Sequence, residues 1–266
     1  MTHSPGILSE MTTEEVERFG PQVVVLGVGS TEPHGPSMPF GTDYFFCDAV
    51  CREAVLRANG RGARALAYPT LPIGNNVNFK GYRFACRIRV RTLMNALLDI
   101  IEQIEEDGIR KIVLVNGHGG NTDAIHAVLR EHFERHSPQA AENKAFVCMA
   151  GPGLSKGPRP EIQSPSPHGG EGEASRMLHL RPDLVRTERF MEQPLRKALL
   201  PSLNEGKVSF VKPWHLFIPL SGGGDTRGAT AEKGKTDFES RVEGIASFLV
   251  ELSQAPWGRN FPYEEA

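Results

Sequence analysis

One short segment of the chain carries three residues of the types that bind metal ions. Glu32, His34 and Asp43 lie within residues 29–43, which are rich in glycine and proline and follow the apolar run 23–28. If the backbone stays extended beyond that run, Glu32 and His34 point the same way, because side chains alternate along an extended chain. Two carboxylates and an imidazole suit a divalent cation of the zinc, manganese or iron type. The alternative is a surface turn with scattered polar residues.

Two later segments repeat this chemistry. Residues 112–121 are an apolar run that leads into a glycine-rich turn, and this turn carries His118. Residues 167–175 precede a helical pattern, and their candidate ligands are His168, Glu171 and Glu173. In an open parallel sheet, ligands bind in the crevice at the carboxyl ends of the strands, so the three loops are expected to share one site. Their common chemistry argues against a simple surface turn.

The elements that must position these loops alternate along the chain. Buried strands are predicted from the apolar and β-branched runs at 23–28, 65–68, 111–115 and 144–149. Helices are predicted from amphipathic periodicity and capping signals at 12–19, 43–58, 92–107, 121–136, 172–180 and 238–253, and Thr42 is a candidate cap for the second. Strands that alternate with helices predict a parallel sheet with helices on both faces.

Three segments show no clear periodicity. Residues 69–82 have the length and composition of a binding loop, whose asparagines either face substrate or satisfy turns; they are Asn75, Asn76 and Asn78. Residues 151–167 are rich in proline and glycine and contain no aromatic residue. Residues 187–224 are predicted to be an irregular excursion that takes part in a subunit interface. On the helix before 136, the histidines are expected to be solvated; they are His126, His132 and His136.

Four motifs carry a resemblance to a known family. They are GSTEPHGP with the following GTD, VNGHGGN, HGGEGEAS and GATAEKG. In these motifs the chain resembles the creatininase family of metal-dependent amidohydrolases. The motifs run in the family's order from residue 29 to residue 234, so the resemblance covers nearly the whole chain. It implies a three-layer α/β/α sandwich with a mostly parallel central sheet, and the length allows a single domain over residues 1–266.

The resemblance also implies a set of site residues. The family's ligand pattern matches Glu32, His34, Asp43, His118 and Glu173, with two divalent ions that share Asp43 as a bridge. Zinc is the first expectation for these ions, with manganese or iron as alternatives. Glu171 competes with Glu173 for the ligand role, and either acid could instead interact with the helix dipole. His168 matches a family histidine that sits beside the metals and transfers protons.

Two features separate the chain from creatininase proper. Gly120 stands where some family members carry an acidic residue, and residues 151–167 offer no aromatic lid for a flat ring. Both features argue against creatinine as the substrate. The predicted reaction is hydrolysis of a non-peptide amide, cyclic amide or formamide of a small molecule. The alternatives are a metal-dependent isomerase or dehydratase acting on a sugar-like substrate, and a non-catalytic family member.

Composition sets the remaining expectations. Thirty basic and 32 acidic residues give a net charge of −2, which offers no footprint for nucleic acid or an anionic membrane. The chain has neither a signal-peptide pattern nor an apolar run near the roughly 20 residues of a membrane span, so a cytoplasmic location is expected. The four cysteines are too sparse for a disulfide framework, and Cys47 and Cys51 are expected to be buried thiols. By resemblance, the chain forms a homo-oligomer, a hexamer, and acts on a small molecule.

Overall fold

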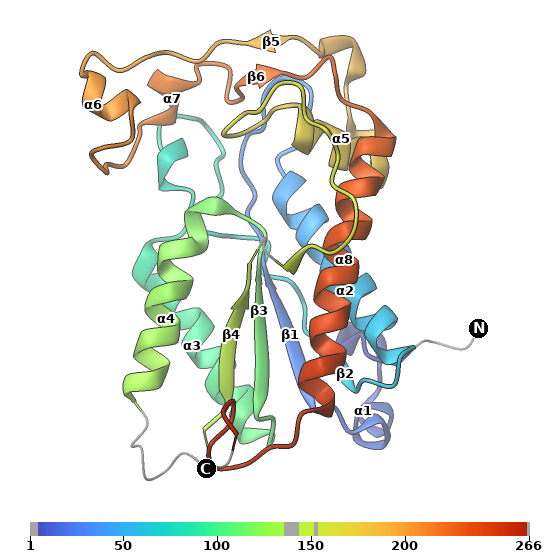
Figure 1. The fold of residues 1–266 in the computed structure, drawn as a ribbon. Coiled ribbons are helices and arrows are strands. Elements are labelled where there is room, and N and C mark those ends of the chain that lie inside the picture. Colours follow the sequence, from blue (N-terminus) through green and yellow to red (C-terminus); the bar gives the residue numbers. More distant parts are fainter. Residues whose placement is uncertain (1–4, 136–143, 152–153, 265–266) are drawn as a thin grey trace.

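A parallel sheet forms the centre of the molecule. The computed structural model describes residues 5–135, 144–151 and 154–264, and its four-stranded sheet has the order β2-β1-β3-β4 (Figure 1). The strands are β1 (Val23–Val28), β2 (Ala65–Ala67), β3 (Lys111–Asn116) and β4 (Phe146–Ala150). All their pairings are parallel. The predicted parallel sheet is therefore confirmed, and each predicted strand agrees with an observed one to within two residues at either end.

Helices cover both faces of this sheet (Figure 1). One face is covered by α2 (Thr42–Asn59) and α8 (Ala231–Gln254), and the other by α3 (Val90–Glu106) and α4 (Thr122–Glu134). Every residue of β1 is buried, as expected for a strand that is covered on both faces. Alternate β1 residues enter different hydrophobic cores, with Val25 on the α2 side and Leu26 on the α3 side. The predicted three-layer α/β/α arrangement is confirmed.

Local sequence explains where several helices begin and end. Thr12 caps α1 (Thr13–Phe19) in a reciprocal capping box with Glu15. The core face of α3 is formed by leucine and isoleucine at helical spacing, and Gly108 follows the helix with a φ of 85°. Thr42 is not a cap, because it is already the first helical residue and its hydroxyl donates to the Pro39 carbonyl.

A cap of short elements lies over the carboxyl ends of the strands (Figure 1). It contains α6 (Pro201–Asn204), α7 (Trp214–Phe217) and an antiparallel pair of β5 (Glu192–Gln193) with β6 (Gly224–Asp225). Helix α5 (Glu171–Leu180) lies beside this cap and packs on α8. The 3-10 helices are η1 (Leu8–Glu10), η2 (Val77–Phe79), η3 (Gly119–Asn121), η6 (Pro182–Leu184) and η7 (Thr187–Arg189). The predicted irregular excursion is thus mostly this cap.

Two other predictions need correction. Helix α8 begins at Ala231 rather than near residue 238, because the Thr230 hydroxyl accepts from the Lys233 N–H and caps it there. His132 is not solvated, since it is 2% exposed and its Nε2 lies 3.0 Å from Glu105 Oε1. His126 is exposed as expected, and residue 136 lies outside the described residues. Among the described helices, none has the length and apolar character needed to cross a membrane.

Candidate metal centre

Adjacent strands bring the three predicted loops together. Glu32 and His34 follow β1, and His118 follows β3, which pairs directly with β1 up to the contact between Val28 and Asn116. Asp43 comes from the first turn of α2. His168 and Glu173 come from the entry and the first turn of α5. The structure therefore gathers all six predicted site residues at the carboxyl ends of β1 and β3, as expected for a parallel sheet.

Asp43 lies between two histidines. Its Oδ1 lies 3.3 Å from His34 Nε2, and its Oδ2 lies 3.0 Å from His118 Nδ1. Asp43 also belongs to two groups of potential ligands, one with Glu32 and His118 and one with His34 and Glu173. Within each group, the ligand atoms lie within 4.8 Å of one another. A carboxylate shared by two such groups has the geometry of a bridge between two ions.

The Glu32 carboxylate is fully buried, and only one of its two oxygens accepts a hydrogen bond. Its Oε2 accepts from the Ser30 hydroxyl at 2.8 Å and lies 3.2 Å from His118 Nε2, but no described group donates to Oε1. Burial raises the pKa of Glu32 to about 7, and Asp43 adds to this, while His118 and His34 oppose it. A buried carboxylate oxygen without a donor is costly, so Oε1 fits a position that a cation would occupy.

Backbone carbonyls orient the two histidines beside Asp43. His34 Nδ1 lies 2.9 Å from the Glu32 carbonyl oxygen and donates to it, so Nε2 faces Asp43. His118 Nε2 lies 3.2 Å from the Asn75 carbonyl oxygen, and Nδ1 faces Asp43. Metal-binding histidines are commonly fixed in this way. Burial alone would lower the pKa of His34, but the charge and hydrogen bond of Asp43 raise it to about 10 in the metal-free protein.

His168 lies beside this cluster as a neutral imidazole. Its Nε2 lies 2.8 Å from the Pro33 carbonyl oxygen and donates to it, which leaves a lone pair on Nδ1 at 3.7 Å from Glu32 Oε1. Burial and the neighbouring charge of His34 lower the pKa of His168 to about 4. His168 also forms a third potential ligand group with Glu32 and His34. The geometry suits both a proton acceptor and a ligand, so its catalytic role stays a prediction.

The structure separates the two competing glutamates. Glu173 accepts from the Gly169 N–H at 2.5 Å and belongs to the ligand group of His34 and Asp43. Glu171 is instead paired with Lys233, whose Nζ lies 2.5 Å from Glu171 Oε1. Lys233 belongs to the GATAEKG motif, so that late motif supports α5 through this ion pair. The geometry favours Glu173 as the ligand.

A cavity of about 710 Å³ opens over these side chains and has an aromatic wall. The ring of Trp214 lies 4.9 Å from that of His168, and the ring of Phe79 lies 4.8 Å from both. Phe210 also lines the cavity. The absence of aromatic residues from 151–167 therefore does not leave the site without an aromatic surface. These residues were not predicted from the sequence, because they reach the site from η2 and from the cap.

The asparagines of the predicted binding loop divide between two roles. Asn78 lines the cavity, and the Asn76 amide donates to nearby backbone carbonyls and to Ser30 and thus fixes the loop. Asn75 does both, since it lines the cavity and its amide donates to the Ile88 carbonyl at 3.1 Å. Gly120 also lines the cavity, and a Cβ atom there would overlap with the Asn75 carbonyl oxygen and the His118 ring. An acidic residue at this position would require the loop to shift.

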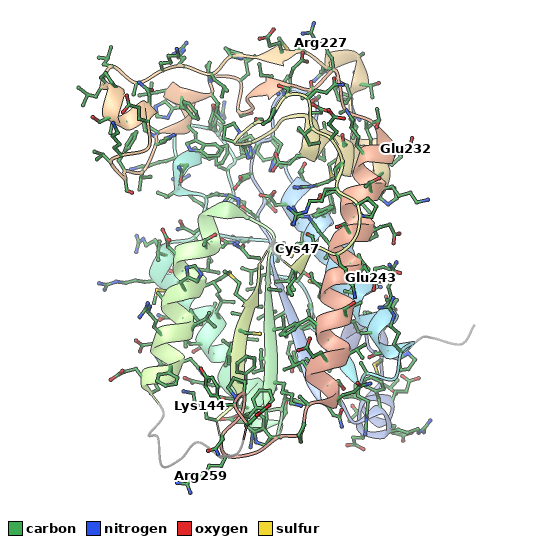
Figure 2. All side chains as sticks on the ribbon, viewed as in Figure 1. Cys47, Lys144, Arg227, Glu232, Glu243 and Arg259 are labelled. Carbon is green, nitrogen blue, oxygen red and sulfur yellow. The ribbon has the colours of Figure 1, made fainter. Side chains whose placement is uncertain are left out.

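Beneath the site, the thiols are buried as expected. Cys47 and Cys51 are free thiols in the core between β1, β3 and α2, and they are 2% and 1% exposed. Figure 2 shows Cys47 close to the carboxyl ends of the strands. Its Sγ donates to the Val115 carbonyl oxygen at 3.4 Å, and neither thiol belongs to the three ligand groups. The thiols therefore pack beneath the site rather than take part in it.

Comparisons with known proteins agree with this geometry. The creatininase family model, described as creatinine amidohydrolase, matches residues 9–249. Creatinine amidohydrolase of Pseudomonas putida is 31% identical over 92% of this chain and 96% of its own length. The mycofactocin precursor peptide peptidase of Mycobacterium tuberculosis is 30% identical over 95% of this chain and 94% of its own length.

Solved structures extend the likeness to the fold. A protein from Bacteroides fragilis, described as a putative creatinine amidohydrolase, superposes with a TM-score of 0.83 at 25% identity and covers 98% of this chain and 99% of its own. Solved creatininases described as Mn and Zn-Zn types are also similar, with TM-scores of 0.74 and 0.73 at 26% identity. The chain belongs to the creatininase family of hydrolases.

Proposed function

We propose that the chain is a binuclear metal-dependent amidohydrolase that acts on a non-peptide amide, cyclic amide or formamide of a small molecule. The observation that carries the proposal is the position of Asp43, whose two oxygens face different histidines and which belongs to two ligand groups. Oε1 of Glu32 also supports the proposal, because no described group donates a hydrogen bond to this buried atom and a nearby cation would stabilise it.

The ligand types suit two divalent ions. Carboxylates and imidazoles, without a thiolate, are typical of catalytic zinc and manganese sites, and iron is a further alternative. Zinc is the first choice in this proposal. The ligands of one ion would be Glu32, Asp43 and His118, and the ligands of the other would be His34, Asp43 and Glu173. When bound, two ions polarise an amide carbonyl and lower the pKa of the attacking water.

Residues around the ions would handle the proton and exclude water. His168 is neutral and presents the Nδ1 lone pair toward Glu32, so it can accept a proton from the nucleophile and return it to the leaving amine. Pro33 fixes this tautomer through its carbonyl oxygen. Phe79 and Trp214 pack around the imidazole and limit its contact with water. A low local polarity strengthens the interactions of the site with a developing charge.

A peptide amide is the second candidate substrate. It is favoured by the Mycobacterium tuberculosis relative, which is a peptide peptidase and aligns with nearly the whole chain. The same ligand set and the same proton acceptor would serve both reactions, because each is hydrolysis of an amide bond. The cavity of about 710 Å³ has room for a small molecule or for the end of a short peptide. The two candidates therefore differ in substrate and not in chemistry.

Hydrolysis assays on matched substrates test this proposal. Protein reconstituted with zinc or manganese would be assayed on creatinine, lactams, N-formyl compounds and short peptides, each with and without chelator. Chelator-sensitive hydrolysis of the non-peptide amides is the expected result. Hydrolysis of the peptides alone would select the second candidate. Fully metal-loaded protein that hydrolyses none of these amides would contradict both.

We also propose that the chain forms a homo-oligomer, and a hexamer in particular, through its cap. Support comes from exposed apolar side chains that are concentrated there, at Leu195, Leu199, Leu200, Val208, Val211 and Leu216. Patches of this kind are typical of protein interfaces. Light scattering coupled to size exclusion should give the mass of six chains; a monomer would contradict the oligomer, and any other assembly size would contradict the hexamer.

A further inference from the structure

Two arginines line the same cavity as the candidate metal centre. Arg176 comes from α5 and Arg241 from α8, and both donate through Nε to Asp237 on α8. The distances to Asp237 Oδ2 are 2.7 Å for Arg176 and 3.2 Å for Arg241. Figure 2 labels Glu232 and Glu243, which bracket this stretch of α8. The two guanidinium groups are thus held side by side on one carboxylate.

Both guanidinium groups are also fixed by an aromatic ring. The Cζ atoms of Arg176 and Arg241 lie 4.8 Å and 5.5 Å from the centroid of Phe46. The two side chains line both the large cavity and a smaller one of about 300 Å³ that contains Phe46. They therefore stand at the junction of the two cavities in a preorganised position, which lowers the entropic cost of binding a ligand there.

The arginines have unused binding capacity. Their Nε atoms are occupied by Asp237, but no described group accepts a hydrogen bond from any of their Nη atoms. Two positive charges share a single carboxylate, which leaves the trio with an excess of one positive charge. Burial lowers the pKa of Arg241, and repulsion from Arg176 lowers it further. An anion between the two groups would relieve this repulsion and use the free donors.

This pair lies within reach of the reacting centre. Arg176 follows Glu173 by three residues on α5, so the two side chains share one helix face, with Cβ atoms roughly 5–6 Å apart. Asp43, Glu173, Arg176 and Arg241 all line the one cavity. A substrate whose amide lies over Asp43 and Glu173 could therefore extend a second group to the arginines.

We propose that Arg176 and Arg241 bind a carboxylate of the substrate, so that the preferred substrate is an amide with a carboxylate close to the scissile bond. This inference rests on the proposed hydrolase function. Arginine pairs are well suited to the role, because the planar guanidinium group matches the geometry of a carboxylate. The carboxylate belongs either to an N-acyl amino acid or to the carboxyl-terminal residue of a peptide, and the chemistry is the same in both.

Kinetics on paired substrates test the specificity. Arg176→Gln and Arg241→Gln should each raise the KM for N-formylglycine about 10- to 100-fold, the loss expected for a charged hydrogen bond. The KM for the neutral N-formylglycinamide should change less than about twofold by the same reasoning. Arg181→Gln is the matched control, because Arg181 directly follows α5 and forms an exposed pair with Asp183 outside the cavity. Equal increases in KM for both substrates would mean that the arginines only join α5 to α8, which would overturn the proposal.

A labelling experiment does not depend on the folding of variants. Phenylglyoxal would modify arginines of the metal-loaded wild-type protein, and mass spectrometry would quantify Arg176 and Arg241. Either N-formylglycine or the peptide glycylglycine should protect both, while their carboxamide counterparts should not, and the effective compound would identify the source of the carboxylate. If the carboxylates protect the two arginines but no amide is hydrolysed, the carboxylate site stands and the proposed hydrolase function is wrong. Unchanged labelling with both carboxylates would overturn the site.

Discussion

The ammonium group of Lys233 lies 2.5 Å from Oε1 of Glu171, which places this buried carboxylate in an ion pair between α5 and α8. The Glu171 Oε2 accepts from the Ser164 N–H at 2.8 Å. Both oxygens are therefore engaged within the protein. Glu173, two residues later, shares a ligand group with His34 and Asp43. The two neighbouring acids should respond to mutation in different ways.

The first prediction compares these acids. Glu173→Gln should abolish hydrolysis with little change in stability, because its carboxylate faces the candidate ions. Glu171→Gln should keep its metal and lower the free energy of unfolding by about 1–3 kcal/mol, since it weakens a buried charged contact. Hydrolysis assays, elemental analysis and thermal unfolding of both variants measure these effects. Metal loss in the Glu171 variant alone would move the ligand role to that residue.

The second prediction concerns the bridge. Asp43→Ala should lose both ions, because Asp43 belongs to both of the ligand groups proposed to hold them, whereas His34→Ala should lose mainly one. The metal-to-protein ratio after exhaustive dialysis against buffer measures both variants. Arg181→Ala, which changes an exposed ion pair outside the cavity, is the control. Full retention of metal in the Asp43 variant would contradict the bridge.

The third prediction concerns the role of His168 in catalysis. His168→Asn should keep its metal content while turnover falls by about 10²–10⁴, the usual range for a lost general acid or base. The reason is that Nδ1 faces Glu32 while Nε2 is held by Pro33. Metal analysis and turnover measured on the same preparation check this expectation. Loss of metal would make His168 a ligand, and full activity would make it a structural residue.

The fourth prediction concerns protons released on metal binding. In the metal-free protein, the pKa of His34 is about 10 and that of Glu32 is about 7, so at pH 7 the first is protonated and the second is half protonated. A cation must displace these protons and those on His118, whose pKa is lowered by burial but raised overall by Asp43 and Glu32, so addition of zinc at pH 7 should release at least about one proton per chain, and affinity should rise with pH. Calorimetry in buffers of different ionisation enthalpy counts the protons. The His34→Asn variant should release fewer, and binding without proton release would contradict the assigned pKa values.

The fifth prediction tests the aromatic wall. Trp214→Ala should raise the KM of a cyclic amide by up to about tenfold, because aromatic contacts contribute about 0.5–1.5 kcal/mol. Trp214→Phe should keep most of the affinity, since a ring would still face His168. Steady-state kinetics on one lactam compares the two. An unchanged KM in the alanine variant would place Trp214 outside the substrate contacts.

The fold was predictable because its signals are local and consistent. The buried run 23–28 and the amphipathic repeat of α3 each indicate one element, and their alternation allows few topologies. Helix α8 was predicted too short because Lys233 and Gly234 interrupt its apolar pattern. Both residues serve tertiary contacts, since Lys233 pairs with Glu171 and Gly234 lies against the backbone of Ser175. Such contacts are not visible in local periodicity.

The site was predictable where residues lie in short motifs and was missed where they converge from distant segments. Glu32, His34 and His118 follow strands directly, so the sheet alone places them together. Trp214 lies in the cap, and its position beside His168 depends on how residues 187–224 fold. The pairing of Arg176 with Arg241 likewise depends on the contact between α5 and α8. Neither contact can be predicted from the spacing of residues in the sequence.

The measurement that tests the central claim most directly is metal stoichiometry combined with hydrolysis. The wild-type protein, purified without chelator and analysed for zinc, manganese and iron, should contain about two ions per chain. Removal of the ions should abolish amide hydrolysis, and their return should restore it. Protein that hydrolyses amides at full rate without metal would contradict the account, as would fully reconstituted protein that binds no more than one ion.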